Sequence, residues 1–528
     1  MEAYKGRPNN SDVARSVRIA LDRRVGKLAG RLKVTPTRAR EIDKSSDAPA
    51  PGSDKLGTVI ARRIEAEVFR GGWRVGQSLG SETELMERFK VSRAILREAI
   101  RQLEVHGAVK MVRGVGGGLV VSQAPHEAAE RALAVYLELL NADVDELFEA
   151  RKILEPLGAR LAAERADDEG IRILRSLSSR LGSTFPQLDV VVPLHFEIRS
   201  RIGEIARNPA LAIFISALSR YTVEVIAQEL AANYPKRGVS DSTAYKQRVV
   251  DAIVGHDPSE AEAAMREDLE SRHGILRRHF KARAAREIAD TPSITASART
   301  GIHPKLNQVV AMTIAHEIGR RNLQPGYGLG KEPDLLVRYG VSRAVFREAI
   351  RILELHGFVR TRRGHAGGLL VSEPNPSYAL ASATEFLRAS KMNRDLFTEI
   401  RETLAVNVAR LAAKRITAEG KMQLESALAA NLAAVGAAVV STARLFHQRI
   451  GELSGNRALS LFNRVVLELN RGSVDSPMPD DTVAALKRNN VRLSDAICAG
   501  DEALARRRMT EHMQDVAQWT AMGPATLR

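Results

Sequence analysis

The chain repeats itself over a long distance. Residues 91–107 read VSRAILREAIRQLEVHG, and residues 341–357 read VSRAVFREAIRILELHG. The offset of 250 residues holds without a gap between residues 55–122 and residues 305–372, where about half of the positions are identical. Solenoid repeats have periods of roughly 20–50 residues. The sequence therefore predicts two whole multidomain units fused head to tail.

The similarity continues more weakly after residue 122. The aligned segments are Arg160-Leu-Ala-Ala with Arg410-Leu-Ala-Ala, IGEIARNPAL around Asn208 with IGELSGNRAL around Asn456, and Asp251-Ala-Ile with Asp495-Ala-Ile. The repeated unit thus spans roughly 230 residues and consists of a head followed by a body.

Composition and proline-containing joints give the boundaries. Residues 1–54 are basic and end in SSDAPAPGSD, which favours a disordered arm, although residues 13–32 could form a short basic amphipathic helix. The predicted parts are the arm at 1–54, the first head at 55–124, the first body at 125–285, a linker at 286–303, the second head at 304–375 and the second body at 376–528.

The charge points to a polyanionic partner. The net charge of +16 favours nucleic acid or an anionic membrane, unless it only solvates the surface. No stretch reaches the ~18 apolar residues that span a bilayer, and the N-terminus lacks the apolar segment of a signal peptide. Cys498 is the only cysteine, which fits a reducing compartment. We therefore expect a cytoplasmic, nucleoid-associated protein that binds nucleic acid and no membrane.

Each head shows the pattern of three helices. In the first head, apolar residues at helical spacing predict a helix over residues 56–70. Ser81 is expected to cap the next helix, ETELMERF, in a capping box with Glu84. After a tight turn, Ser92 is expected to cap RAILREAIRQLEVH, which Gly107 ends.

The third helix carries a row of arginines. Arg93, Arg97 and Arg101 recur every four residues and form one basic ridge. Such a helix suits the major groove of DNA, where the arginine fork can bond O6 and N7 of guanine. Alternatively, the arginines only form surface ion pairs with Glu98 or Glu104. The opposite, buried face is expected to consist of Ile95, Ala99, Ile100 and Leu103.

Two short strands around a glycine tip follow each arginine-bearing helix. They predict a β-hairpin wing whose basic residues reach a phosphate or the minor groove. The candidate DNA-binding residues are therefore Ser92, Arg93, Arg97, Arg101, Arg113, Ser342, Arg343, Arg347, Arg351, Arg362 and Arg363.

The heads resemble the GntR family of bacterial regulators. The pattern G-x-x-L-x-x-E-x-x-L-x-x-x-x-x-VSR-x-x-x-REA occurs within residues 76–99 and again within residues 326–349. The resemblance implies two winged helix-turn-helix domains whose turn and recognition helix contact DNA through arginines. A further family arginine is replaced by Thr83 and Pro333, which bears on the operator sequence.

The bodies resemble the all-helical C-terminal domain, called FCD, of the FadR subfamily. The resemblance rests on LFEARKILE at residues 147–155 and on the Arg160-Leu-Ala-Ala segment. It implies a mainly α protein in which each body is an antiparallel bundle around a pocket for a small, often carboxylate-bearing effector. Many members hold a divalent metal there, through an Asp and a His four residues apart and two later histidines.

Neither body keeps this set of ligands. The four positions are His195, Arg199, Lys246 and Asp268 in the first body, and Ala443, His447, Asn490 and His512 in the second. We expect no metal and no other cofactor, because an arginine cannot ligate a metal and two histidines are too few.

The same positions suggest another role. We hypothesise that Arg199 and Lys246 replace the positive charge of the metal and bind an anionic effector, with Asp268 as counter-ion. A purely structural salt bridge is the alternative. The candidate effector-binding residues are His195, Arg199, Lys246, His447, Asn490 and His512, of which His447 and His512 are expected to be remnants of the pocket.

Together these features predict a sequence-specific transcriptional regulator and not an enzyme. No nucleophile elbow, phosphate loop or paired-carboxylate signature occurs, and the glycines at 116–118 lie in a wing. Two heads in one chain predict an intramolecular pseudo-dimer that reads an imperfect palindrome in double-stranded DNA. A homodimer with four heads is one alternative, and a sequence-tolerant nucleoid or architectural protein is the rival interpretation.

Overall fold

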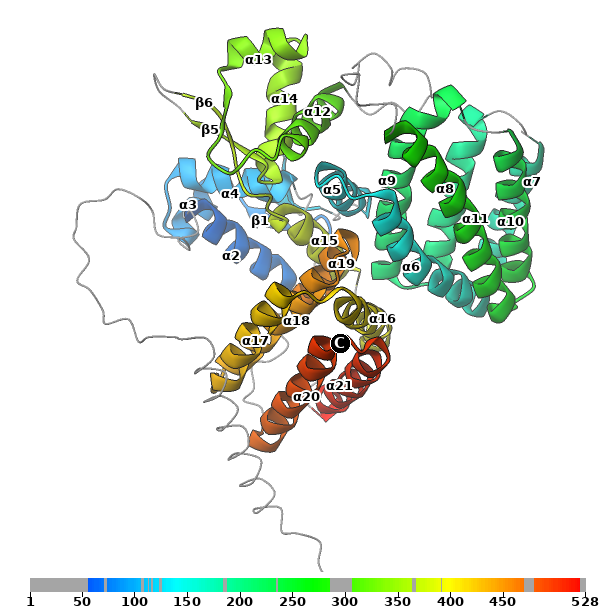
Figure 1. Cartoon of the computed structure of the whole chain (residues 1–528). Helices are drawn as coiled ribbons and strands as arrows, with labels where there is room; N and C mark the ends of the chain where they lie inside the picture. The colour runs from blue at the N-terminus through cyan, green and yellow to red at the C-terminus, as the bar shows by residue number, and fades with distance from the viewer. Residues whose placement is uncertain are drawn as a thin grey trace, which may run out of the picture. The chain divides into compact units, whose positions relative to one another are not determined.

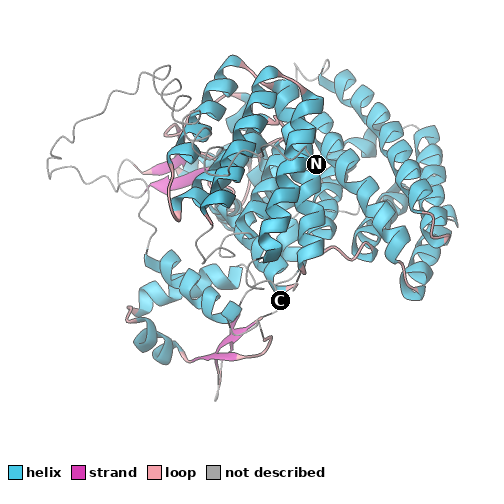
Figure 2. Cartoon of the chain, turned by 90° about the horizontal axis from the view of Figure 1, so that it is seen from below, coloured by secondary structure: helices cyan, strands magenta, loops and turns pink. Residues whose placement is uncertain are grey.

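The chain is mainly helical, with two small antiparallel sheets (Figure 2). The computed structural model describes residues 56–70, 74–105, 109–112, 114, 117–122, 126–183, 188–233, 236–284, 306–362, 367–390, 392–469 and 479–522. The expected arm at 1–54 and linker at 286–303 lie outside these residues. The described chain forms a larger unit, within Lys55–Thr403 and Asn456–Leu469, and a smaller unit, within Leu404–Gly455 and Asn470–Leu527.

Two segments have the same order of elements with the same lengths. The first contains α2 (Leu56–Arg70), β1 (Ser78–Gly80), α3 (Glu82–Phe89), α4 (Arg93–Val105), β2 (Val109–Val112) and β3 (Gly118–Val121). The second contains α12 (Leu306–Arg320), β4 (Gly328–Gly330), α13 (Glu332–Tyr339), α14 (Arg343–Leu355), β5 (Val359–Arg362) and β6 (Gly368–Val371).

Each of these segments has a three-stranded antiparallel sheet. The strand orders are β1-β3-β2 and β4-β6-β5, so the last two strands form the predicted hairpin. The first strand was not predicted, because three residues carry too little periodicity to be recognised and their partners lie about 40 residues away.

The core of the first segment lies between α2, α3, α4 and the sheet. Ile64, Leu85 and Leu103 are almost completely buried in it. On α4 the expected buried face differs at one position, because Leu96 is fully buried whereas Ile95 is only partly covered. The prediction was correct for Ala99, Ile100 and Leu103.

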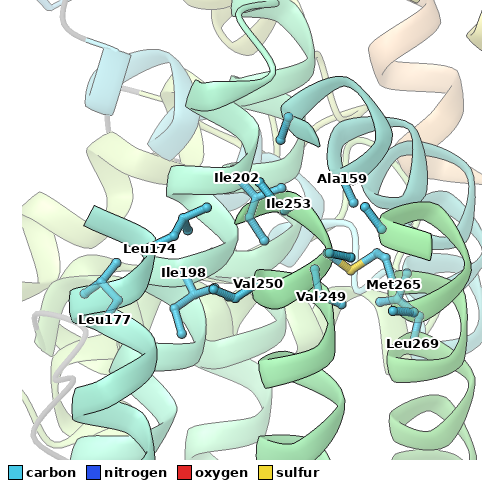
Figure 3. Packing of buried hydrophobic residues seen from close by; sticks show 14 of the residues in the cluster. Ala159, Leu174, Leu177, Ile198, Ile202, Val249, Val250, Ile253, Met265 and Leu269 are labelled. Atoms are coloured by element: carbon cyan, nitrogen blue, oxygen red, sulfur yellow. The ribbon is translucent and has the colours of Figure 1, made fainter. Parts of the chain in front are cut away.

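A helical bundle follows the first of these segments. Its elements are α5 (His126–Leu139), α6 (Val144–Arg165), α7 (Asp168–Ser183), α8 (Leu188–Ile205), α9 (Pro209–Asn233), α10 (Lys236–Val254) and α11 (Pro258–Ala284). Helices α6 to α11 pack against one another (Figure 1). Figure 3 shows their shared apolar core, in which Ile198, Val249 and Leu269 are fully buried. Such burial of aliphatic side chains is what stabilises the bundle.

The remaining helices follow the second segment. They are α15 (Ser377–Ala389), α16 (Arg394–Arg415), α17 (Ala418–Ala433), α18 (Ala438–Leu453), α19 (Arg457–Leu469), α20 (Asp480–Ala499) and α21 (Glu502–Met522). In the smaller unit, α17 packs against α18 and α20, and α20 packs against α21. In the larger unit, α15 packs against α5 and α19.

Two asparagines that align in the sequence repeat also make equivalent contacts within the larger unit. The Asn208 side-chain amide donates to the backbone oxygen of Leu396 and to Oε2 of Glu399, both at 2.9 Å. These residues belong to helix α16, whereas Asn208 directly precedes α9. The contact therefore joins residues almost 200 positions apart.

The second asparagine, Asn456, makes the equivalent contact in the opposite direction. The Asn456 amide donates to the backbone oxygen of Glu146 and to Oε2 of Glu149, also at 2.9 Å. Phe214 and Phe462, each six residues after its asparagine, are fully buried and stack with their ring centroids 4.3 Å apart. The two related sequences thus contact each other reciprocally.

Candidate nucleic-acid interface and effector site

The turn before α4 is fixed by local interactions. Ser81 accepts a hydrogen bond from the backbone of Glu84, whose carboxylate accepts one from the backbone of Ser81, so the predicted capping box is confirmed. Lys90 then ends α3 in the left-handed conformation, at φ 52°. This sharp turn lets α4 begin at Arg93. The helix, turn and second helix therefore have the geometry in which the second helix can enter a groove.

The arginines of α4 are exposed and held by one carboxylate. Arg97 Nε lies 2.6 Å from Glu82 Oε1, and Arg93 Nε lies 3.5 Å from the same atom. Both arginine side chains are more than 60% exposed (62% and 65%). The hydrogen bond from Arg97 holds the pKa of Glu82 below its usual range. The partner of these two arginines is Glu82 and not Glu98 or Glu104, whereas Arg351 of the second segment does pair with Glu348, the counterpart of Glu98.

The second segment repeats this arrangement. Arg343 Nε and Arg347 Nε both lie 3.1 Å from Glu332 Oε1. Ser342 caps α14 by accepting a hydrogen bond from the backbone of Val345. Glu82 and Glu332 were not among the predicted site residues. Both glutamates occupy the Glu position of the motif at residues 76–99 and 326–349, which could have identified them.

The rest of the candidate DNA-binding set is only partly described. Ser92, Arg101, Arg351 and Arg362 are exposed, whereas Arg113 and Arg363 lie outside the described residues. A carboxylate on each third helix holds the adjacent hairpin: Glu104 accepts from the Met111 backbone, and Glu354 from the Thr361 backbone.

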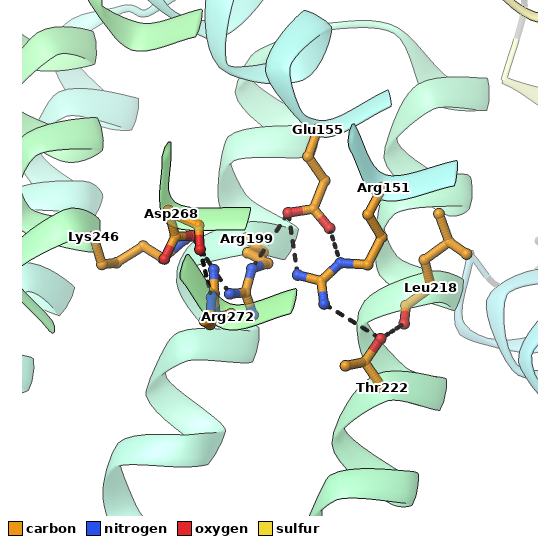
Figure 4. A network of polar contacts seen from close by, with 8 residues as sticks. All are labelled: Arg151, Glu155, Arg199, Leu218, Thr222, Lys246, Asp268 and Arg272. Atoms are coloured by element: carbon orange, nitrogen blue, oxygen red, sulfur yellow. Dashed lines mark hydrogen bonds and ion pairs between the residues drawn. The ribbon is translucent and has the colours of Figure 1, made fainter. Parts of the chain in front are cut away.

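The helical bundle of the larger unit contains a buried polar cluster (Figure 4). Asp268 binds three cations: Lys246 Nζ at 2.9 Å, Arg199 Nη2 at 3.7 Å, and Arg272, with which it is also hydrogen bonded. Glu155 lies 3.4 Å from Arg199 Nε and accepts a 2.5 Å hydrogen bond from Arg151. The cluster therefore joins residues of α6, α8, α10 and α11.

Cations outnumber carboxylates in this cluster. Arg151, Arg199, Lys246 and Arg272 form ion pairs with Glu155 and Asp268, and all six side chains are at least 90% buried. Burial, together with Arg199, holds the pKa of Lys246 well below its usual range. Burial alone would raise the pKa of Glu155, but Arg151 and Arg199 lower it. A buried excess of positive charge is the environment that an anion stabilises.

His195 lies beside these cations. It is 7% exposed, and neither ring nitrogen has a hydrogen-bond partner among the described residues. Burial, with Arg199 and Lys246 nearby, holds its pKa well below the usual range. A neutral imidazole can donate one N–H and accept at the other nitrogen. The structure thus brings together the predicted residues His195, Arg199 and Lys246 of the first body. Arg272 was not predicted, although its position four residues after Asp268 on a helix could have revealed it.

The three candidate residues of the second body lie in the smaller unit. His447 and His512 stack with their ring centroids 4.8 Å apart. Asn490 donates a 3.0 Å hydrogen bond to Asn431. No three His, Cys, Asp or Glu side chains among the described residues come together as a metal site would require.

No helix within the described ranges combines the length and the apolar character needed to cross a membrane.

Three segments match known domain families. Residues 56–118 match the family described as bacterial regulatory proteins, gntR family. Residues 146–271 and residues 397–515 both match the FCD domain. The first match covers α2 to the start of β3, and the other two cover most of the helical regions.

Two named relatives each match 40% of this chain. A transcriptional regulator, LutR of Bacillus subtilis, is 25% identical over 216 residues, which are 40% of this chain and 98% of LutR. The Exu regulon transcriptional regulator of Escherichia coli is 26% identical over 213 residues, 40% of this chain and 81% of the relative. A solved structure, the GntR protein of Streptococcus agalactiae, is 22% identical and covers 41% of this chain and 99% of its own, with a TM-score of 0.31.

These relatives are named as transcriptional regulators, which points away from an enzyme. The chain is therefore similar to bacterial regulatory proteins of the gntR family at residues 56–118, and to the FCD domain at residues 146–271 and 397–515.

Proposed function

We propose that this protein is a cytoplasmic transcriptional regulator of the FadR subfamily that arose by fusion of two GntR–FCD units. Its two heads, residues 55–124 and 304–375, read the two halves of an imperfect palindrome in double-stranded DNA. A small anionic effector, bound in the helical bodies, changes the affinity for that operator.

The proposal that the heads bind DNA rests on the exposed arginine ridge. Arg93 and Arg97 project from the helix that follows a tight turn, and Arg343 and Arg347 do the same in the second head. Glu82 and Glu332 hold each pair in a fixed orientation, which suits bidentate bonding to a base. An exposed ion pair contributes little to stability, so the paired arginines remain available to DNA.

Reciprocal contacts support a pseudo-dimer within one chain. In a two-fold interface, residue i of one copy contacts residue j of the other, and the reverse contact also occurs. Asn208 and Asn456 satisfy this rule, and Phe214 and Phe462 stack as a like pair would on a two-fold axis. The relatives cover about 40% of the chain, a length that fits into it twice. Two tethered heads would engage DNA with higher avidity than one.

The buried cluster supports an anionic effector in the first body. Arg199, Lys246 and Arg272 all bind Asp268, so positive groups outnumber this carboxylate, and the neutral imidazole of His195 lies beside them. In the second body, His447, Asn490 and His512 occupy the aligned positions and would contact the effector without a metal. An effector acts only if it binds one arrangement of the bodies more tightly than another.

Substitution of the recognition arginines tests the DNA-binding role. Arg93→Ala and Arg343→Ala should each weaken operator binding by about 1–3 kcal/mol and relax the preference at one base pair. Binding is measured at fixed salt with DNA that flanks the gene, located by footprinting. Arg172→Ala, which removes an exposed arginine of α7, is the control of equal charge. Unchanged operator affinity in both head variants would refute the assignment.

Competition with random DNA separates the proposal from sequence-tolerant binding. A specific regulator should retain its operator in excess random DNA, because base contacts add to the phosphate contacts that all sequences share. Equal competition by both DNAs would instead indicate an architectural protein.

A further inference from the structure

The two heads differ in the residue that ends the second helix of each. In the first head this residue is Lys90, with φ 52° and ψ 49°, and in the second it is Gly340, with φ 63° and ψ 35°. Both lie in the left-handed region of backbone conformation, which costs free energy for a residue with a Cβ atom and little for glycine. Glycine is therefore the less strained residue at this position, and the first head has a lysine there instead.

No side-chain contact within the described part of the chain accounts for Lys90. The side chain is exposed, and no carboxylate of a described residue pairs with it. Arg207, another cation in the left-handed region at φ 53°, differs in this respect, because its Nη2 atom lies 2.7 Å from Asp167 Oδ2. Backbone strain without a compensating contact points to a function. Lys90 lies three residues before Arg93, where α4 begins, so that function concerns the DNA-binding turn.

The wings differ in the opposite sense. Val112 of β2 lies opposite Gly118, and Arg362 of β5 lies opposite Gly368, so the two residues occupy the same place in their hairpins. In each head a carboxylate from the third helix accepts from the backbone of the preceding strand residue, so both hairpins are held alike. Both side chains are exposed, Val112 to 40%. The first wing thus exposes an apolar side chain where the second exposes a cation.

We propose that the two heads bind the phosphate backbone of DNA through different elements, the first through Lys90 in its turn and the second through Arg362 in its wing. The inference rests on the proposed function, because it applies only if the heads bind double-stranded DNA. Lys90 precedes its recognition helix and Arg362 follows its own, so the additional phosphate contact lies beside opposite ends of that helix in the two half-sites. Phosphate contacts set the register and orientation of a head on the duplex, whereas base contacts supply specificity.

The salt dependence of DNA binding by the full chain tests this assignment. The dissociation constant for the operator duplex is measured at several sodium chloride concentrations, because each phosphate contact contributes about 0.9 to the slope of log Kd against the logarithm of the salt concentration. Lys90→Gly and Arg362→Val each introduce the residue of the other head, and both should reduce this slope by about 0.9. Gly340→Lys and Val112→Arg should each increase the slope by a similar amount.

Unfolding without DNA distinguishes a lysine that serves binding from one that serves the fold. Lys90→Gly should raise the thermal unfolding midpoint while it weakens DNA binding, because glycine relieves the left-handed backbone. Gly340→Lys should lower the midpoint; a lysine side chain fits there, since nothing lies within 4 Å of an added Cβ atom. Arg172→Ala, which removes an exposed charge of α7 outside the heads, is the control and should leave the slope unchanged.

Four outcomes would contradict the assignment. An unchanged slope in either Lys90→Gly or Arg362→Val overturns it, because the head concerned would lack the contact assigned to it. An equal reduction in Arg172→Ala overturns it as well, because the effect would then come from net charge alone. A lower midpoint for Lys90→Gly would mean that the lysine serves the fold. A wild-type chain that binds no duplex refutes the proposed function itself, whereas wild-type binding with unchanged variant slopes refutes only this assignment.

Discussion

The two heads carry the same arginine rows on their surfaces, whereas the two bodies differ at several buried polar positions. Arg93, Arg97 and Glu82 of the first head recur as Arg343, Arg347 and Glu332 with nearly the same contacts. In the bodies, by contrast, several aligned buried positions carry different residues.

The buried differences occur together. Glu155, Lys246 and Asp268 of the first body correspond to Ala405, Asn490 and His512 of the second. A buried charge needs a partner, so the loss of one member of an ionic cluster leaves the others uncompensated. Buried polar residues that contact one another are therefore expected to differ together between the two bodies. An exposed ion pair can change without affecting other residues.

The largest expected effect concerns the shared carboxylate of the first body. Asp268→Ala should lower the free energy of unfolding by about 3–5 kcal/mol, because it leaves Lys246, Arg199 and Arg272 without their common partner. His512→Ala, at the aligned position of the second body, should cost less, since it removes an imidazole that stacks on His447 and not a carboxylate that three cations share. Urea unfolding measures both. Equal losses of unfolding free energy would show that Asp268 is no more important to its core than His512 is to the core of the second body.

The next effect is a dependence on pH. Arg151 and Arg199 lower the pKa of Glu155 below its ordinary value of 4.5. A carboxylate whose pKa is lower in the folded than in the unfolded protein stabilises the folded state. This stabilisation is complete at pH values above the pKa of the unfolded state, and it is lost as the pH falls through the pKa of the folded state. Wild-type protein should therefore lose more stability than Glu155→Gln as the pH falls below about 4.5. Denaturant titrations at several pH values check this, with the surface variant Glu164→Gln as control. Parallel pH profiles for wild type and Glu155→Gln would contradict it.

The smallest effect distinguishes the two heads. Ser81 caps α3, whereas the aligned Lys331 makes no side-chain hydrogen bond at the start of α13. Lys331→Ser should stabilise the second head by about 0.5–1 kcal/mol, because serine can accept a backbone N–H and a lysine is unfavourable at the positive end of a helix. Ser81→Ala should destabilise the first head by about 1 kcal/mol. Calorimetry of both variants compares them, and no change in either would mean that the caps are irrelevant to stability.

Local chemistry made the first head largely predictable. The capping box at Ser81 and Glu84 and the apolar face of α4 depend on residues within one or two turns of each other. The exceptions were the choice of Leu96 over Ile95 and the strand β1, because both depend on what packs against them.

By itself, the sequence determined the helical segments, the hairpins and the exposed arginine rows, because each depends on spacing along one short stretch. Only the tertiary structure decided which charges meet. Lys246 reaches Asp268 through the packing of α10 on α11, and Asn208 reaches Glu399 across almost 200 residues. The linear order of residues does not show such pairings, since the energy of a buried charge depends on neighbours that folding brings together.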